Sequence, residues 1–142
     1  MAKPKKKTIA KVVEDAAVLL QKLVRMKAAD DNGYCSCVTC GDTMKWNEGM
    51  NGGHFIDRGH TVTKIMEENV HPQCNACNSP NANKGLVIGR YTIYMQDMYG
   101  HDFVADMLNT KGQTKKYYRD EVLEIIEDFK DQIKIEAERL GC

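Results

Sequence analysis

The rest of this chain is organised around three short stretches: C-V-T-C at residues 37–40, G-G-H-F at 52–55 and E-N-V-H-P-Q-C-N-A-C-N at 68–78. The two C-x-x-C pairs are separated by 33 residues. Each short turn brings two thiolates to one cation, and two such turns fill the tetrahedral shell that zinc prefers. We therefore predict a structural zinc site with no open position, made by Cys37, Cys40, Cys74 and Cys77.

The six cysteines are also compatible with a disulfide framework of a secreted protein. The paired spacing and the leftover Cys142 favour metal over disulfides, as does a lysine-rich start without the apolar stretch of a signal peptide. No apolar run approaches the length needed to span a membrane. We therefore expect a zinc protein of the reducing cytoplasm with no membrane partner.

Charge is distributed unevenly although the net charge is zero. Residues 1–30 carry eight Lys or Arg against three Asp or Glu, and residues 120–142 carry three against eight. A surface that binds DNA must therefore be local. The candidates are the basic tail at 1–7 and the four side chains Arg58, Lys64, Lys84 and Arg90. The tail is equally compatible with a solvated terminus.

The length and the apolar periodicity predict one α+β domain over residues 1–142. It comprises the basic tail at 1–7, a helix at 8–30 with Thr8 as N-cap, a zinc-clamped core at 34–85 and a helical part at 86–142. Within the core we expect short strands at 54–56 and 62–66 and a poor, short helix after Asn78. The C-terminal part is predicted to form a helix that ends near Gly100, a continuation to Leu108 and a long amphipathic helix over 115–140.

Three polar residues in the core have contexts that suit chemistry. His54 follows two glycines and precedes the apolar pair Phe55 and Ile56, so burial is expected to shift its pKa toward that of a usable base. Asn78 directly follows a zinc-bound cysteine, which restricts its position and suits a ligand. With Asn69 between them, these residues form the ordered set histidine, asparagine, asparagine.

This ordered set resembles the motif of the HNH, or ββα-metal, endonucleases, in which a β-hairpin and a helix hold one divalent cation. A longer run of residues is similar to the phage lambda NinG (Rap) recombination nuclease family. That run comprises Val38-Thr39-Cys40-Gly41, Gly53-His54-Phe55, Asn69-Val70-His71-Pro72-Gln73-Cys74, Cys77-Asn78, Tyr91 and Tyr99-Gly100. Together the similarity covers about residues 37 to 108.

The resemblance implies a small zinc-clamped ββα-metal core, flanked by the N-terminal helix and the C-terminal helices. It implies that His54 deprotonates the attacking water and that Asn69 pins the loop and orients the histidine ring. It further implies that Asn78 ligates the catalytic metal through its side-chain oxygen. For a phage-encoded protein, the compartment would be the cytoplasm of the host cell.

The second ligand of the catalytic metal is less evident, because many superfamily members have an acidic ligand where this chain has Gly53. Hard cations such as Mg²⁺ need oxygen ligands, and Asp57 and His71 are the candidates for the replacement. The NinG resemblance favours His71, whose imidazole would shift the preference toward Mn²⁺ or similar ions.

With these roles, the resemblance implies metal-dependent hydrolysis of DNA phosphodiester bonds. Arg58 is expected to clamp the transition state or a neighbouring phosphate. The NinG resemblance implies branched DNA such as Holliday junctions, and cleavage of two strands would favour a homodimer. A general nicking or restriction-type nuclease would share the motif. A non-enzymatic zinc module that binds nucleic acid or protein is the alternative from another functional class.

Overall fold

The computed structural model describes residues 5–142, and the first four residues of the predicted basic tail lie outside this range. The helices are α1 (Ile9–Ala28), α2 (Lys84–Tyr99), α3 (His101–Leu108) and α4 (Arg119–Leu140). The strands are β1 (Tyr34–Ser36), β2 (Thr43–Lys45), β3 (Met50–His54) and β4 (Val70–Cys74), and a 3₁₀ turn (Glu67–Asn69) precedes β4. The strands form two antiparallel pairs, β1 with β2 and β3 with β4. The predicted α+β class is confirmed.

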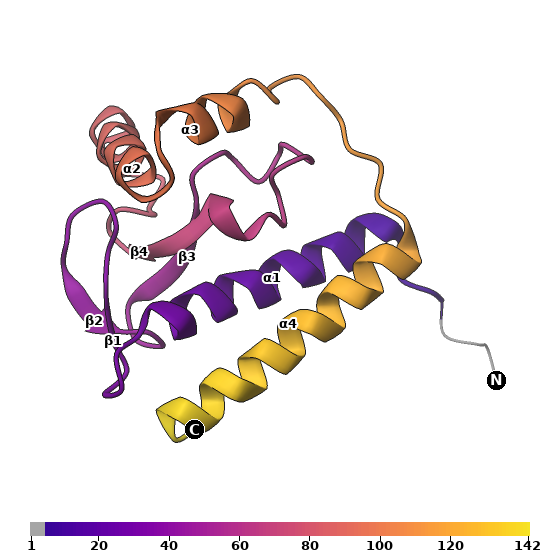
Figure 1. The fold of residues 1–142 in the computed structure, drawn as a ribbon, viewed down its shortest axis with the longest axis horizontal. Helices are drawn as coiled ribbons and strands as arrows, with labels where there is room; N and C mark the ends of the chain where they lie inside the picture. The colour runs from indigo at the N-terminus through magenta and orange to yellow at the C-terminus, as the bar shows by residue number, and fades with distance from the viewer. Residues whose placement is uncertain (1–4) are drawn as a thin grey trace.

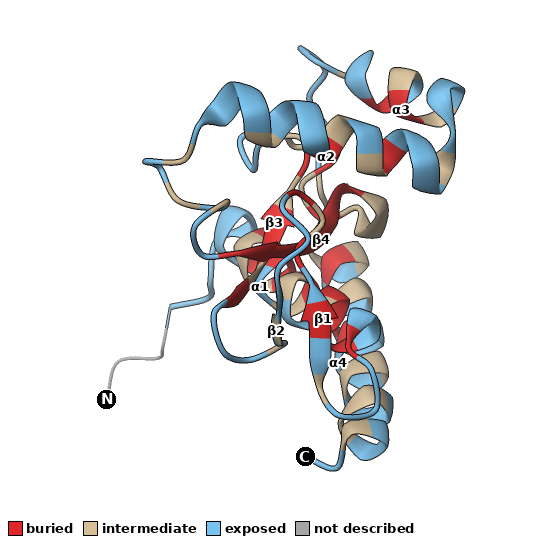
Figure 2. Cartoon of the chain, turned by 90° about the vertical axis from the view of Figure 1, so that its left-hand side faces the viewer, coloured by how far each residue is buried: buried red, intermediate tan, exposed pale blue. Residues whose placement is uncertain are grey.

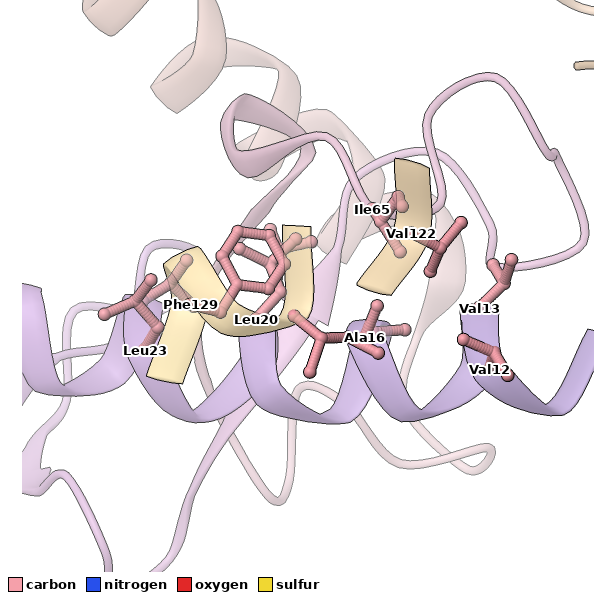
Figure 3. Close-up of a cluster of buried hydrophobic side chains, with 12 residues drawn as sticks. Val12, Val13, Ala16, Leu20, Leu23, Ile65, Val122 and Phe129 are labelled. Atoms are coloured by element: carbon pink, nitrogen blue, oxygen red, sulfur yellow. The ribbon is translucent and has the colours of Figure 1, made fainter. Parts of the chain in front are cut away.

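Helix α1 lies at the centre of the molecule, with α4 on one side and the β3–β4 hairpin on the other (Figure 1). Its apolar stripe has the predicted three- and four-residue spacing, and the predicted N-cap Thr8 accepts a hydrogen bond from the backbone N–H of Lys11. Figure 3 shows Leu20 and Leu23 of this stripe packed against Phe129 of α4. Because full burial of one leucine contributes about 1.5–3 kcal/mol, this seam is a major source of stability.

The β3–β4 hairpin packs one face on α1 and the other on α2. In its register Gly53 is paired with His71 and His54 with Val70. Side chains of directly paired residues share a face, and neighbours along a strand alternate between faces. His54 therefore lies on the α1 side of the hairpin, and His71 lies on the α2 side.

Gly52 is required where α1 crosses the hairpin. A Cβ atom at this position would lie 2.6 Å from the Cα atom of Gln21, which is helix backbone that cannot rotate away. We expect Gly52→Ala to lower the free energy of unfolding by about 1–3 kcal/mol, as overpacked cores do. Urea denaturation followed by circular dichroism measures this loss. The control is Gly89→Ala, since a Cβ atom at Gly89 meets no atom within 4 Å, and a smaller loss at Gly52 than at Gly89 would contradict the prediction.

Helices α2 and α3 form the outer layer over the far face of the hairpin (Figures 1 and 2). Phe55, Tyr91, Met95, Val104 and Met107 are the buried residues of this layer. Helix α2 ends before Gly100 as predicted, because that glycine has a φ of 86°. Asp102 lies in the first turn of α3 and makes no side-chain capping bond.

Several predicted boundaries are wrong. Residues 62–66 form turns and not a strand, and the partner of β3 is β4, at 70–74. No helix follows Asn78 directly; turns continue until α2 begins at Lys84. Helix α4 begins at Arg119 instead of residue 115, because residues 115–117 are tied to the loop at Thr61.

In the part of the chain from residue 5 onward, no helix combines the length and the apolar character needed to cross a membrane.

Candidate functional site

The four predicted zinc ligands come together between two turns. The sulfur atoms of Cys37, Cys40, Cys74 and Cys77 all lie within 4.8 Å of one another. A tetrahedral zinc ion with bonds of about 2.3 Å separates its sulfurs by about 3.8 Å, and the Cys40 and Cys74 sulfurs are 3.7 Å apart. All six cysteines are free thiols. The geometry therefore fits a closed structural metal site and not a disulfide.

Backbone hydrogen bonds hold the two cysteine turns against each other. The N–H of Val38 donates to the carbonyl of Pro72 at 3.0 Å, which ties the first turn to β4. Burial disfavours the Cys37 thiolate, but hydrogen bonds from the Thr39 hydroxyl and from nearby backbone N–H groups lower the pKa of Cys37 to about 6. A thiolate stabilised in this way is the form that binds zinc.

A polar pocket of about 260 Å³ lies beside this cluster, on the α1 side of the β3–β4 hairpin. Its lining includes four of the residues that the sequence singled out: His54, Asp57, Arg58 and Asn78. Asn78 is fixed by its own backbone, because its N–H donates to the carbonyl of the cluster residue Cys74 at 3.0 Å. The end of β3, the loop after it and the second cysteine turn therefore converge on one pocket.

The ring of His54 is held in one orientation. Its Nε2 lies 2.8 Å from the carbonyl oxygen of Lys64, and a carbonyl can only accept, so Nε2 carries the proton. Nδ1 is then left with a free lone pair. Burial lowers the pKa of His54, and the bond to the Lys64 carbonyl opposes this shift. The imidazole is therefore neutral at neutral pH.

Asn69 pins the loop that carries the Lys64 carbonyl. Its side chain is fully buried. The amide nitrogen donates to the carbonyls of Ile56 and Thr63 at 2.9 and 3.1 Å, and the amide oxygen accepts from the N–H of Ile56 at 2.8 Å. The Asn69 side chain therefore positions His54 indirectly, because it fixes the loop whose Lys64 carbonyl holds the His54 ring.

A carboxylate of α1 forms ion pairs with two basic side chains beside the pocket. Glu14 forms an ion pair with Arg58 through one oxygen and with Lys64 at 2.9 Å through the other. The two predicted DNA-binding residues in the loop are thereby brought together. Lys84 and Arg90, the other two predicted DNA-binding residues, lie on α2, and Arg90 lines a separate pocket beside Cys77.

The structure does not bring His71 to this pocket, contrary to its prediction as a metal ligand. The hairpin register places it on the opposite face from His54. Both ring nitrogens are already used: Nδ1 lies 3.2 Å from the Tyr91 hydroxyl and Nε2 lies 2.8 Å from that of Tyr99. The Tyr91 hydroxyl donates to the carbonyl of Gly53 at 2.6 Å, so Nδ1–H of His71 donates to Tyr91 and Tyr99 donates to Nε2.

This buried imidazole makes stability depend on pH. Burial lowers the pKa of His71 to about 4, although Glu67 opposes the shift, whereas an unfolded histidine titrates near 6.5. The unfolded state therefore binds more protons between these values. The lowered pKa of His71 thus accounts for about 3 kcal/mol of the unfolding free energy, which is fully present above about pH 6.5 and is lost as the pH falls to about 4.

We expect His71→Gln to flatten the pH dependence of the unfolding free energy between pH 6.5 and 4.5, because glutamine does not titrate but can accept from Tyr99 and donate to Tyr91. Urea titrations at each pH measure the slopes, over the range in which both proteins keep their zinc. The other histidines contribute equally to both proteins, so equal slopes would contradict the prediction.

Three residues near the pocket were not predicted: Gln21 and Asn51, which line it, and Glu14. The signal for Gln21 is its polar side chain among the buried Leu20 and Val24 of α1. Asn51 lies directly before the two glycines of β3. Nothing in the spacing of Glu14 indicates its ion pairs.

A search of curated proteins and a search of solved structures found no significant match. A family model described as bacteriophage lambda NinG protein matches residues 1–139. The match covers both cysteine turns, every residue of the pocket and the four helices except the last residue of α4, and it agrees with the resemblance of residues 37–108. The chain therefore belongs to the bacteriophage lambda NinG protein family.

Proposed function

We propose that this protein is a metal-dependent HNH-type endonuclease that hydrolyses DNA phosphodiester bonds, with branched DNA such as Holliday junctions as its substrate. One observation carries the proposal: a neutral His54 of fixed tautomer shares a pocket with Asn78, Asp57 and Arg58. A purely structural zinc module has no use for that combination. Membership of the NinG family supports a role in bacteriophage recombination.

In this mechanism His54 is the general base. Its Nδ1 lone pair accepts a proton from the attacking water, and the Lys64 carbonyl stabilises the imidazolium that results, since Nε2–H remains bonded to it. Asn69 is a positioning residue that acts through the loop. Arg58 is the cation beside the pocket that can hold a phosphate oxygen, once its ion pair with Glu14 is exchanged.

The donors of the pocket suit a hard divalent cation. Asn78 and Asp57 would hold it through side-chain oxygens. Such a cation, Mg²⁺ or Mn²⁺, would polarise the scissile phosphate and neutralise charge on the leaving oxygen. The cysteine cluster would hold a separate, structural zinc ion.

Nicking of supercoiled plasmid tests the activity. The zinc-loaded protein is passed over a chelating resin and assayed with and without added Mg²⁺ or Mn²⁺, because EDTA in the assay would also extract the zinc. We expect nicking only with the added cation. Protein that binds DNA but never nicks it with either cation would overturn the proposal in favour of a binding module.

A substrate panel then tests the DNA structure. Linear, nicked, flapped and four-way DNA of matched sequence are cleaved under the same conditions, and the proposal expects the four-way substrate to be preferred. Equal cleavage of all four substrates would contradict junction specificity and support a general nicking nuclease. Symmetric cleavage of a junction needs two active sites, so size-exclusion chromatography with the junction bound is expected to show two copies of the chain.

The lowered pKa of His54 predicts the pH profile of cleavage. A general base works when it is unprotonated, so kcat/KM should rise with pH with a midpoint below the ordinary histidine pKa of about 6.5. Single-turnover rates from pH 5 to 8, over the range in which the protein keeps its zinc, give this profile. A rise that continues above pH 7.5 would assign the limiting proton to another group.

A further inference from the structure

A groove of about 320 Å³ lies between the start of α1 and the connector (residues 109–118) that joins α3 to α4. In Figure 1 the connector descends at the right of the molecule to the N-terminal end of α1. Its lining combines apolar residues of α1 with three lysines and two residues of the loop and the connector. The apolar residues are Ile9, Ala10 and Val13, the lysines are Lys64, Lys115 and Lys116, and the other two are Thr61 and Tyr117.

Residues 109–112 of the connector form turns, and residues 113–118, which contain neither helix nor turn, are tied to the loop that follows β3. Thr61 accepts hydrogen bonds from the N–H of Lys115 and, at its carbonyl, from the Tyr117 hydroxyl. Side chains alternate along extended backbone, so residues two apart lie on the same side. Each of two lysines accordingly lies beside the tyrosine two residues further along. Lys115 lies 4.9 Å from the ring centre of Tyr117, and Lys116 lies 5.5 Å from that of Tyr118.

The second of these pairs is presented to solvent. Tyr118 is 63% exposed, and its side chain makes no capping bond to α4. Lys115 is paired with Glu121, but no carboxylate between residues 5 and 142 forms a salt bridge with Lys116. An exposed tyrosine beside an uncompensated lysine offers a stacking surface and a phosphate contact side by side.

The Glu14 ion pairs connect the groove with the polar pocket that contains His54. Lys64 lines the groove and shares the Glu14 carboxylate with Arg58, which lines the pocket. Both cavities lie along α1, from Val13 at the groove to Gln21 at the pocket. Eight residues of helix rise about 12 Å, which is roughly three to four nucleotide steps at 3.4 Å each.

More positive charge gathers at this end of α1. The side chain of Arg119 donates to the carbonyl of Lys7 at 2.7 Å, so Lys7 lies beside the start of α4. Lys7 itself is paired with Asp15. Lys5 and Lys6 are exposed.

We propose that the connector and its groove bind the DNA strand three to four nucleotides from the scissile phosphate. Lys116, which lines the groove, contacts a phosphate, and the exposed Tyr118 beside it stacks on an unpaired base. The inference rests on the proposed function for its position relative to the cleavage site. The groove adds to that function a surface that recognises an unstacked base beside the cut.

The test measures binding by full-length, zinc-loaded protein without an added divalent cation, so that no cleavage occurs. The probes are fluorescein-labelled single-stranded and forked DNA and the same strands with 2-aminopurine at successive unpaired positions. The variants are Lys116→Glu and Tyr118→Ala, both at exposed positions. The matched control is Lys45→Glu with Tyr34→Ala, an exposed lysine–tyrosine pair on the β1–β2 hairpin at the opposite end of α1.

We expect Tyr118→Ala to weaken binding of single-stranded and forked DNA about tenfold and to abolish a 2-aminopurine fluorescence change at one position. Lys116→Glu should lower the slope of log K against log salt by about one. The inference is overturned if both variants bind like the wild type, if the control pair weakens binding equally, or if the wild type binds none of these probes. If the variants lose binding at specific positions while the wild type never nicks plasmid, the groove proposal stands and only the nuclease proposal fails.

Discussion

His54→Ala is expected to lower the rate of phosphodiester cleavage by about two to four orders of magnitude, the usual contribution of a general base. The fold should survive, because the side chain makes one hydrogen bond, to the Lys64 carbonyl, at the edge of a solvent-accessible pocket. Single-turnover cleavage of the preferred substrate under saturating Mg²⁺ or Mn²⁺ measures the rate. DNA affinity should remain within about twofold of wild type.

The matched control for this variant is His60→Ala. His60 lies in the loop that directly follows His54 and strand β3, but it does not line the pocket. We expect full activity from it. Equal losses in both variants would indicate a general disturbance of the loop, and an active His54→Ala protein would require another base.

Cys74→Ser is expected to abolish stoichiometric zinc binding and to unfold the region at 34–85. Zinc contributes about 10–16 kcal/mol to the folding of small zinc peptides, which exceeds the whole stability of many domains. Cys74 is buried in β4, and its carbonyl also accepts from the N–H of Asn78. The pocket should therefore be lost together with the metal.

Zinc content by mass spectrometry and thermal melts followed by circular dichroism measure these effects. Cys142→Ser is the control, because Cys142 is exposed and lies outside the cluster. Helices α1 and α4 share a core that contains no cluster cysteine, so part of the helical signal should remain. A Cys74→Ser protein that keeps one zinc and an unchanged melting temperature would show that the cluster has no structural role.

The elements that sequence periodicity predicted best are those with a regular stripe of apolar residues. Helix α1 has such a stripe, and its observed bounds differ by one or two residues from those expected. The four clustered cysteines were found by spacing alone. Local signals of this kind need no knowledge of the tertiary structure.

Strand β4 could not be found in the same way. All five of its residues are buried, so it lacks the alternation by which a half-exposed strand is recognised. Pro72 within it is also atypical of a strand. The weak alternation at 62–66 is the stronger strand signal, but that segment forms turns, and its Thr63 carbonyl accepts a hydrogen bond from the buried amide of Asn69.

The face on which His71 lies could not be predicted without knowing that it belongs to this strand. Spacing along the chain places it between Asn69 and Cys74, near every other candidate residue. Only the pairing with Gly53 shows that it faces α2 while His54 faces α1, because a shift of one residue in register moves a side chain to the other face. Gln21 was missed for a related reason: its contribution to the pocket depends on how α1 crosses the hairpin.

The Glu14 bridge to Arg58 and Lys64 bears on how a nuclease of this kind would release its product. In the free protein an internal anion already rests between the two cations. An incoming phosphate must compete with it, and after the cut the same carboxylate is ready to return. If the proposed function is right, this competition would weaken DNA binding and speed release of the nicked strand.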